Sequence, residues 1–279
     1  MERYAESVDR HYGNGEVITK IFKGFDLADK NINSLTVDDL SPVDEFHTRG
    51  KQSTLEVAEL VDLKPTDHVL DVGCGLGGTA RHLAEHYKCS VFGIDLTEEY
   101  ISAGTKLTEL VGLSDRVELR QGNALQIPYE NNQFDTVWTE HVQMNIADKN
   151  GFYSELARVL KPGGHLLFHD VFLGALASPH YPVPWAEDES LSSLVTEHEA
   201  RLIMERVGFK IAHWKIKVKE SIEFFRKGLS LMETDGPPPL GIHLLMGYNA
   251  KEKLGNYYLN LLESRVTVAL GAARKNTEF

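Results

Sequence analysis

The chain is 279 residues long, with 42% hydrophobic and 25% charged residues, a composition typical of a globular protein with a large core. With 29 Lys and Arg against 41 Asp and Glu, the net charge of −12 argues against a nucleic-acid partner. No segment is apolar and long enough to cross a bilayer, and the first residues show no apolar leader. Cys74 and Cys89 are expected to be small core residues. We therefore expect a cytoplasmic protein without membrane or nucleic-acid partners, whose oligomeric state the composition leaves open.

Residues 1–50 are predicted to form an N-terminal helical cap. Their hydrophobic residues recur at roughly helical spacing on both sides of a break at residues 13–15, but they are too sparse to form a core alone. The cap therefore has to lie over another part of the chain. Tyr12 is a candidate to place its hydroxyl over a bound ligand, unless it only packs in the core. Behind the cap, Ser53 and Glu56 have the spacing of a capping box.

The central feature of the sequence is the glycine-rich stretch of residues 68–83. Val69, Leu70 and Val72 predict a buried strand, the glycines predict a turn, and a helix is expected to open at Thr79. Glycine lets backbone N–H groups approach a ligand, and the first helical turn adds free N–H donors. This arrangement predicts a nucleotide-like ligand at the carboxyl end of a parallel sheet.

The glycine spacing by itself is compatible with two ligands. Gly73, Gly75 and Gly78 fit the dinucleotide pattern G-x-G-x-x-G, whereas Gly73, Gly75 and Gly77 fit the G-x-G-x-G of adenosylmethionine enzymes. Asp95, about 20 residues further on, fits either ligand because both present ribose hydroxyls. The choice between them depends on the rest of the chain.

Strands and helices alternate after this turn, which predicts an α/β fold with a doubly wound, mostly parallel sheet. Further strands are expected at 90–95, 116–120, 134–138 and 165–170, with helices at 98–111 and about 150–160. A proline- and aromatic-rich loop follows at about 175–195, and loops of this length are usually lids or binding loops. Thr196 and Glu199 form a second capping box. A helical insertion at about 220–264 precedes a last strand at 265–274.

Five motifs occur in the order and at the spacing of one enzyme family: 70–78 (LDVGCGLGG), 93–95 (GID), 122–124 (GNA), 134–138 (FDTVW) and 158–164 (RVLKPGG). Over residues 50–170 they resemble the class I S-adenosylmethionine-dependent methyltransferases of small-molecule type. The wider layout is more loosely similar to the sarcosine/dimethylglycine N-methyltransferases. The resemblance implies a seven-stranded Rossmann-like sheet, in a methyltransferase domain of residues 51–279 behind the cap.

The resemblance also implies S-adenosyl-L-methionine as the cofactor. Its contacts are then expected at Gly73, Gly75, Gly77, Asp95, Leu96, Asn123, Ala124, Thr139 and Glu140. In these roles Asp95 binds both ribose hydroxyls and Asn123 meets the adenine edge. Thr139 and Glu140, just past the fourth strand, approach the methionyl group.

Methyl transfer requires an aligned nucleophile and the exclusion of water, with a base only when the nucleophile arrives protonated. Many relatives carry a histidine a few residues beyond the fourth strand, where this chain has Met144 and Asn145; His141 comes earlier. The family's base therefore does not transfer directly to this sequence. The catalytic candidates are His141, Asp170 and Tyr12, and the acceptor-binding candidates are Gln143, Asn145, Tyr181 and Trp185.

Two further groups are candidates for ligand binding. His169 beside Asp170 resembles a metal-binding pair, but no third ligand is visible nearby, so no metal is predicted. His47 with Arg49 either reaches a ligand or simply links two segments.

The favoured function is methyl transfer by in-line displacement to a small-molecule nitrogen, oxygen or carbon, with a small amine such as sarcosine or dimethylglycine as one candidate acceptor. An NAD(P)-dependent oxidoreductase and a non-catalytic adenosylmethionine-binding module are the alternatives.

Overall fold

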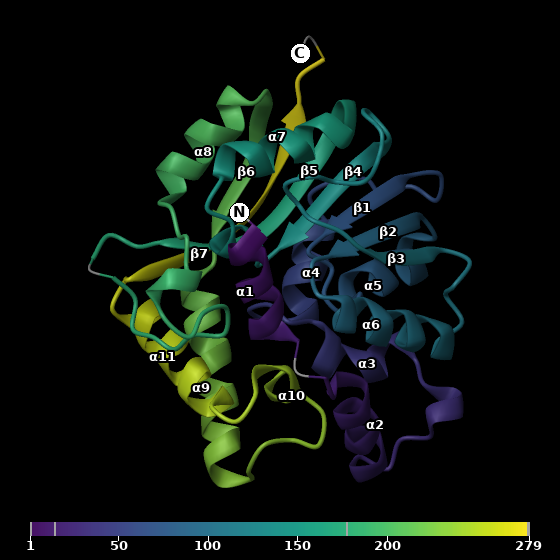
Figure 1. Cartoon of the computed structure of the whole chain (residues 1–279), viewed down its shortest axis with the longest axis vertical. Helices are drawn as coiled ribbons and strands as arrows, with labels where there is room; N and C mark the ends of the chain where they lie inside the picture. The colour runs from purple at the N-terminus through teal and green to yellow at the C-terminus, as the bar shows by residue number, and fades with distance from the viewer. Residues whose placement is uncertain (1, 14, 177, 278–279) are drawn as a thin grey trace.

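The computed structural model describes residues 2–13, 15–176 and 178–277 and contains one seven-stranded sheet (Figure 1). The strands are β1 (His68–Val72), β2 (Ser90–Asp95), β3 (Val117–Gln121), β4 (Phe134–Glu140), β5 (Leu160–Leu173), β6 (Phe209–Ile216) and β7 (Val266–Lys275). They lie in the order β3-β2-β1-β4-β5-β7-β6, and β7 runs antiparallel to both of its neighbours. The doubly wound, mostly parallel α/β sheet predicted from the sequence is confirmed.

Helices cover both faces of the sheet. They are α1 (Glu2–Tyr12), α2 (Val17–Leu27), α3 (Val37–Asp44), α4 (Lys51–Ala58), α5 (Gly78–Tyr87), α6 (Glu98–Leu110), α7 (Lys149–Val159), α8 (Glu197–Arg206), α9 (Val218–Thr234), α10 (His243–Met246) and α11 (Ala250–Leu262). One face packs against α7 and α8, which contribute Phe152 and Met204, and the other against α4 and α5, which contribute Val57 and Leu83. In the described part of the chain, no helix has the length and apolar character needed to span a membrane.

Two further helical clusters extend the sheet domain. The first joins α2, α3 and α10 to α6 around Phe25 and Leu40, and the second joins α9 and α11 to the loop that carries Trp185. Figure 1 shows α1, in purple, lying between these two clusters. The predicted cap therefore lies against both the sheet domain and the insertion.

A pair of hydrogen bonds anchors the cap where its first two helices meet. Asn14, in the predicted break, lies outside the described residues. The backbone N–H groups of Gly15 and Val17 both donate to the carboxylate of Glu99, at 2.7 Å each. This carboxylate fixes the start of α2 onto the first turn of α6.

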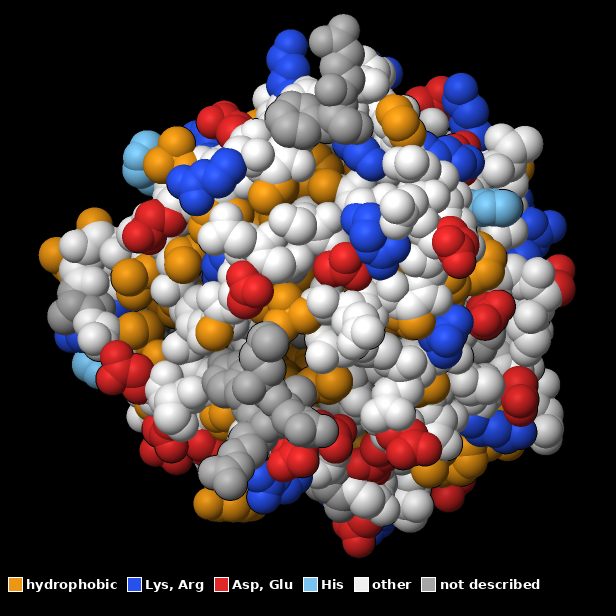
Figure 2. Space-filling model, turned by 45° about the horizontal axis from the view of Figure 1, so that its top comes forward, with side chains coloured by type: hydrophobic (Ala, Val, Ile, Leu, Met, Phe, Trp, Pro, Cys, Tyr) orange, Lys and Arg blue, Asp and Glu red, His pale blue; other side chains and the backbone are white. Residues whose placement is uncertain are grey.

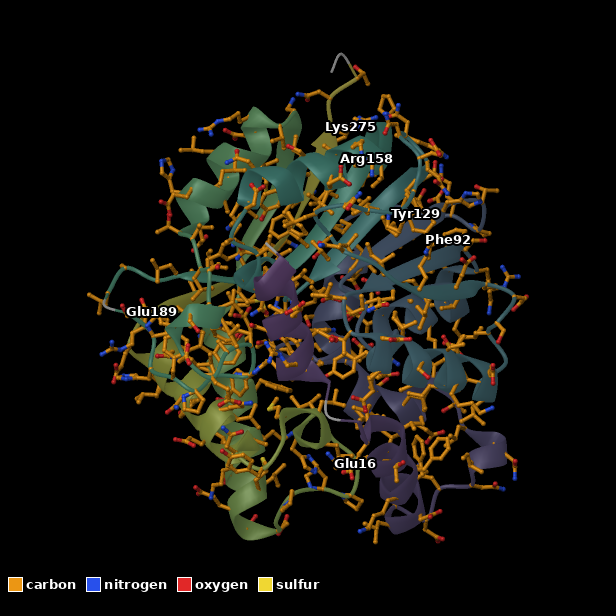
Figure 3. The ribbon with its side chains drawn as sticks, in the orientation of Figure 1. Glu16, Phe92, Tyr129, Arg158, Glu189 and Lys275 are labelled. Carbon is orange, nitrogen blue, oxygen red and sulfur yellow. The ribbon has the colours of Figure 1, made fainter. Side chains whose placement is uncertain are left out.

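The loop between β3 and β4 is held by an aromatic cluster and one arginine (Figure 3). Tyr129 packs edge-to-face on Phe92 and Phe134, with ring centroids 6.0 and 5.0 Å away. Arg158 donates to the carbonyl oxygens of Tyr129 and Ile127, at 2.8 Å each. These contacts set the position of the loop that carries the GNA motif.

The capping box predicted at Ser53 is wrong. Helix α4 begins at Lys51 with Gly50 as its N-cap and has no side-chain cap. The Ser53 hydroxyl donates instead to the carbonyl oxygens of Thr48 and Gly50, because the chain enters this helix one turn earlier than the pattern suggested. The second capping box, formed by Thr196 and Glu199, is confirmed.

The predicted start of the fifth strand is also wrong. β5 begins at Leu160 rather than His165, and its register against β4 shifts between the partners of Phe134 and Thr136. Gly163 has a φ of +76°, a conformation that glycine adopts without strain. The Lys-Pro-Gly-Gly corner is therefore an irregularity inside a long strand.

Candidate active site

A cavity of about 810 Å³ lies where the glycine turn, the ends of β2 and β4 and the N-terminal cap meet. Its lining includes many of the predicted site residues: Tyr12, Gly73, Gly75, Asp95, Leu96, Asn123, Ala124, Glu140, His141, Asn145 and Trp185. These residues are spread over more than 170 positions of the chain. The fold therefore brings most of the predicted site together.

The glycines of the turn do different things. Gly75 lines the cavity, and a Cβ added to it would meet no atom within 4 Å. Its φ is +53°, a conformation that favours glycine. A Cβ on Gly73 would lie 2.2 Å from Cγ2 of Val142, and one on Gly77 2.8 Å from Leu119. Gly75 thus leaves bare backbone for a ligand, whereas Gly73 and Gly77 permit close packing. Gly77 is not part of the cavity lining.

Asp95 is oriented by backbone groups on both sides. Its Oδ2 accepts the N–H of Gly75 and its Oδ1 accepts the N–H of Thr97, at 2.9 Å each. Burial raises the pKa of Asp95, while these two N–H donors oppose the rise. Because each carboxylate oxygen accepts more than one hydrogen bond, the group can still bind a vicinal diol. Asp95 is therefore preorganised for the ribose role that the resemblance implies.

The side of the cavity beyond Asp95 is apolar with a few polar atoms. Leu96, Ala124 and Ile146 line it. The side-chain oxygen of Asn123 accepts the N–H of Leu125 at 2.8 Å, so its amide group is the part left to a ligand. Asp148 also lines this side, and its carboxylate caps α7 by accepting the N–H of Gly151.

A hydrogen-bonded roof joins the cap to the lid loop. The Tyr12 hydroxyl donates to Oδ1 of Asn145 at 3.0 Å. The Asn145 amide donates in turn to the carbonyl oxygens of Trp185 and Leu191, at 2.8 and 2.9 Å. The ring of Tyr12 also packs edge-on against Phe46, at 6.1 Å between centroids. Tyr12, Asn145 and Trp185 therefore close one side of the cavity together, and we refer to these three residues as the roof.

The floor of the cavity is polar and buried. Oε2 of Glu140 accepts hydrogen bonds from Trp138 Nε1 and Thr79 Oγ1, at 2.9 Å each. His47 lies alongside, with Nε2 2.8 Å from Oε2 of Glu45 and 3.5 Å from Oε2 of Glu140. Burial favours neutral His47, but the two carboxylates outweigh it and raise the pKa of His47 to about 9. The same attraction overcomes burial at Glu140 and lowers its pKa to about 2.

His141 faces the cavity from a strained backbone position. Its φ is +52°, which is rare for a residue with a Cβ and recurs at functional sites. Nε2 accepts the N–H of Thr48 at 3.4 Å, a long hydrogen bond. Burial, followed by the charges of His169 and His47, holds the pKa of His141 well below its usual range. The ring is therefore neutral and a weaker base than a free imidazole, and its Nε2 lone pair is directed at Thr48.

Asp170 and Gln143 lie behind the cavity rather than in its lining. Oδ2 of Asp170 accepts the N–H groups of Val142 and Gln143, at 3.3 and 3.2 Å. The Gln143 amide donates to the carbonyl oxygen of Val171 at 2.5 Å. Gln143 follows the sharp turn at His141 and Asp170 lies within β5, and both side chains bind backbone groups. They hold the segment that carries His141 and do not reach a ligand in the cavity.

Thr139 and Tyr181 are also outside the lining. Thr139 is 2% exposed and lies within β4. Tyr181 packs against the cluster formed by α9, α11 and the lid loop. Several lining residues were not predicted from the sequence, among them Val8, Thr79, Thr97, Tyr100 and Asp148. For Thr97 and Tyr100 a signal was available, because they follow Asp95 directly into α6.

Comparisons with known proteins find a family match over the central part of the chain. Residues 70–168 match the family model described as a methyltransferase domain. This stretch contains the glycine turn, Asp95 and the strands β1 to β4. Over this stretch the chain is therefore similar to methyltransferase domains.

The same comparisons find similarity to individual methyltransferases and to solved structures. Over 170 residues the chain is 31% identical to the glycine/sarcosine/dimethylglycine N-methyltransferase of Actinopolyspora halophila, and the match covers 61% of this chain but only 30% of that protein. The chain superposes on phosphoethanolamine N-methyltransferase 2 of Haemonchus contortus with a TM-score of 0.73 to 0.74 at 20% identity. The superposition covers 98% of this chain and 60% of that one, and one of those structures contains phosphomonomethylethanolamine and S-adenosylhomocysteine. The [4+2]-cyclase SpnF superposes with a TM-score of 0.72 at 20% identity, over 98% and 97% of the two chains. At such identities these structures share the fold.

Proposed function

We propose that this protein transfers a methyl group from S-adenosylmethionine to a small molecule bound under the roof. The observation that carries the proposal is one cavity with bare backbone at Gly75, an oriented carboxylate at Asp95 and a closed roof. When bound, the cofactor would supply a methyl group on a good leaving group. Asp95 would hold the ribose, Leu96, Asn123 and Ala124 the adenine, and Glu140 would face the methionyl end.

The chain's own contribution to the reaction is alignment and the exclusion of water. The roof covers the reacting end of the cavity through Tyr12, Asn145 and Trp185. We assign acceptor contacts to Asn145 and Trp185. Asp170 and Gln143 act as positioning residues, because they fix the segment after β4 by hydrogen bonds to backbone groups.

A small amine is the acceptor class that we propose to test first. Aromatic rings of Tyr12, Phe46 and Trp185 line the cavity together with the carboxylate of Glu140. Ring faces and carboxylates both attract a cationic amine. The name of the Actinopolyspora halophila relative points in the same direction, and sarcosine and dimethylglycine belong in the first acceptor panel.

The test has two stages. Binding is followed first by thermal shift, where S-adenosylhomocysteine is expected to raise the melting temperature and NAD(P) is not. Transfer is then measured with a radiolabelled methyl donor and a panel of amines, alcohols and carbon acids. Stabilisation by NAD(P) alone would support the oxidoreductase. Tight binding of the methyl donor without transfer to any acceptor would support a binding module.

The comparison with the SpnF structure shows why the transfer assay is needed. A protein named as a [4+2]-cyclase has this fold, so the fold by itself does not establish methyl transfer. Labelled product is the result that decides the activity.

We also propose a cytoplasmic location and no nucleic-acid partner. Cys74 and Cys89 are both free and buried, as expected of a reducing compartment. On the face shown in Figure 2, Lys and Arg side chains are scattered among Asp and Glu rather than gathered into a patch. Together with the net charge of −12, this disfavours a phosphate backbone as ligand.

Asn145→Ala is expected to weaken the roof more than Tyr12→Phe does. Asn145 bridges three groups, whereas Tyr12→Phe removes a single hydrogen bond worth about 1 kcal/mol. We expect dissociation of S-adenosylhomocysteine to accelerate about tenfold in Asn145→Ala and about fivefold or less in Tyr12→Phe. Stopped-flow displacement measures both rates. Asn249→Ala, which removes an exposed amide, is the control, and equal rates in all variants would contradict the roof.

His141→Gln tests whether the catalytic candidate His141 acts as a base. For an acceptor that arrives protonated, we expect kcat to fall about 100-fold, at the low end of general-base effects. The affinity for S-adenosylhomocysteine is expected to stay within a factor of three, because the His141 ring is held by Thr48 and not by the cofactor-binding turn. A kcat within threefold of wild type would remove His141 from the mechanism. It would leave the alignment role of the cavity intact.

A further inference from the structure

Three side chains from distant segments converge under the floor of the cavity. His47 comes from the loop after α3, Glu140 from the end of β4, and His169 from the middle of β5. One potential ligand atom from each lies within 4.8 Å of the other two. Nε2 of His47 is 3.5 Å from Oε2 of Glu140, and Nδ1 of His169 is 3.5 Å from Oε1 of Glu140. No metal was predicted from the sequence, because no third ligand was visible near His169 and Asp170. The fold brings two further potential ligands, His47 and Glu140, next to His169.

Several atoms of this cluster have no hydrogen-bond partner among the described residues. They are Nε2 of His169, and Nδ1 of His169 with Oε1 of Glu140, which have only each other at 3.5 Å. His169 is fully buried, and the Glu140 side chain is 4% exposed. A buried polar atom without a partner costs about 1–3 kcal/mol, so three in one place call for an explanation. An ion held between the two side chains would satisfy the facing pair, Oε1 and Nδ1.

The charge of the surroundings also favours a cation. Glu45, Asp71 and Glu140 are all buried here, and one Asp71 oxygen is without a partner among the described residues. Burial, and then the charges of Glu140 and Glu45, hold the pKa of Asp71 well above its usual range. Arg49, which is also buried nearby, is bound to Glu56. The cluster therefore has more carboxyl groups than cations to neutralise them.

We infer that His47, Glu140 and His169 form a binding site for a divalent transition-metal ion at the floor of the cavity. Two imidazoles and one carboxylate suit Zn²⁺, Fe²⁺ or Co²⁺, whereas Mg²⁺ and Ca²⁺ prefer oxygen ligands throughout. For metal–ligand bonds of about 2.1 Å, neighbouring ligand atoms lie about 3.0–3.4 Å apart. The 3.5 Å between Nδ1 of His169 and Oε1 of Glu140 is close to this range, and Nε2 of His47 lies 3.5 Å from the other oxygen of the same carboxylate.

The groups around the three ligands fit this role. Nδ1 of His47 lies 3.1 Å from the Ser53 hydroxyl, and Nε2, which is 2.8 Å from Oε2 of Glu45, would bind the ion after giving up that contact and its proton. Trp138 and Thr79 fix the other oxygen of Glu140. His47 and Glu140 line the cavity, so the open positions of a three-ligand site would face the bound acceptor.

The test is a Co²⁺ titration of the full chain, purified without a histidine tag and freed of metal by a chelator. Co²⁺ reports its ligands by visible absorption. We expect one equivalent to bind to the wild type. His169→Gln and His47→Gln are each expected to weaken binding by more than about 100-fold, which exceeds the usual effect of altering a supporting residue. His213→Gln, an exposed histidine on β6, is the matched control and should bind as wild type.

The outcomes separate the metal site from the proposed function. The titration is done on ligand-free protein, so it does not depend on methyl transfer or on binding of an adenosyl compound. Circular dichroism and the thermal shift with S-adenosylhomocysteine show that each variant is folded, and two independent ligand variants guard against misfolding of one. Absence of stoichiometric Co²⁺ binding in the wild type, or equal binding by both ligand variants and the control, would overturn the inference in favour of a metal-free histidine–glutamate cluster.

Discussion

Asp95→Ala is expected to lower the affinity for S-adenosylhomocysteine by about 10³-fold. The substitution removes two charge-assisted hydrogen bonds to the ribose, each worth about 1.5–3 kcal/mol. It also leaves the N–H groups of Gly75 and Thr97 without their present acceptor, which loosens the turn itself. Isothermal titration calorimetry measures the change.

Two comparisons make the Asp95 result interpretable. Asp95→Asn keeps the size of the side chain and one oxygen acceptor, so its loss should be intermediate. Asp115→Ala removes an exposed carboxylate from the loop before β3 and should bind as wild type. Unchanged affinity in Asp95→Ala would remove the ribose assignment, and with it the principal support for an adenosyl cofactor.

Arg81→Met is expected to destabilise the fold by about 3–5 kcal/mol, the cost of leaving a buried charge unpaired. The guanidinium of Arg81 is fully buried and donates to Asp44 Oδ2 at 2.7 Å and to the carbonyl oxygen of Leu76 at 2.6 Å. It also binds the carbonyl oxygen of Gly104 and the hydroxyl of Thr108. One side chain thus connects α3 of the cap, the glycine turn and α6. Urea unfolding measures the loss.

The pH dependence of this loss follows from Asp44. Burial raises the pKa of Asp44 to about 6 even with Arg81 beside it. Without the arginine this pKa rises further, so the folded variant binds a proton that the unfolded chain has released. The destabilisation should therefore shrink as the pH falls from 8 to 5. Asp44→Asn in the Arg81→Met background should recover part of the stability, and Arg226→Met in an exposed pair should cost less than about 1 kcal/mol. A loss of equal size for the buried and exposed arginines would contradict this account.

The sheet and the cofactor half of the site could be predicted because their signals are local. The strand, the glycines and Asp95 lie within 30 positions of one another, and each residue type reflects a backbone or hydrogen-bonding requirement of its own segment. The same holds for the capping box at Thr196, which depends on two residues three positions apart.

The rest of the site depends on pairings that no local pattern contains. Asp44 meets Arg81 and His47 meets Glu140 only after the cap has folded onto the sheet. Gln143 and Asp170 were predicted to face the cavity, but the Gln143 amide binds the backbone of Val171, and the Asp170 carboxylate, inside β5, binds the N–H groups of Val142 and Gln143. The position of a residue in the sequence predicts which part of the fold its side chain lies in, whereas the local backbone conformation decides which way that side chain points.

The antiparallel strand β7 has a consequence for the order in which the protein assembles. It inserts between β5 and β6, and in the described chain β6 pairs only with β7. The nearest residues of β5 and β7 are separated by more than 90 positions, so this pairing carries a large loop-closure cost. On the ribosome, the first five strands can emerge and pair while the edge of β5 is still open. Until β7 has been synthesised, that edge is available to other extended chains, and protection by a chaperone would matter most at this stage.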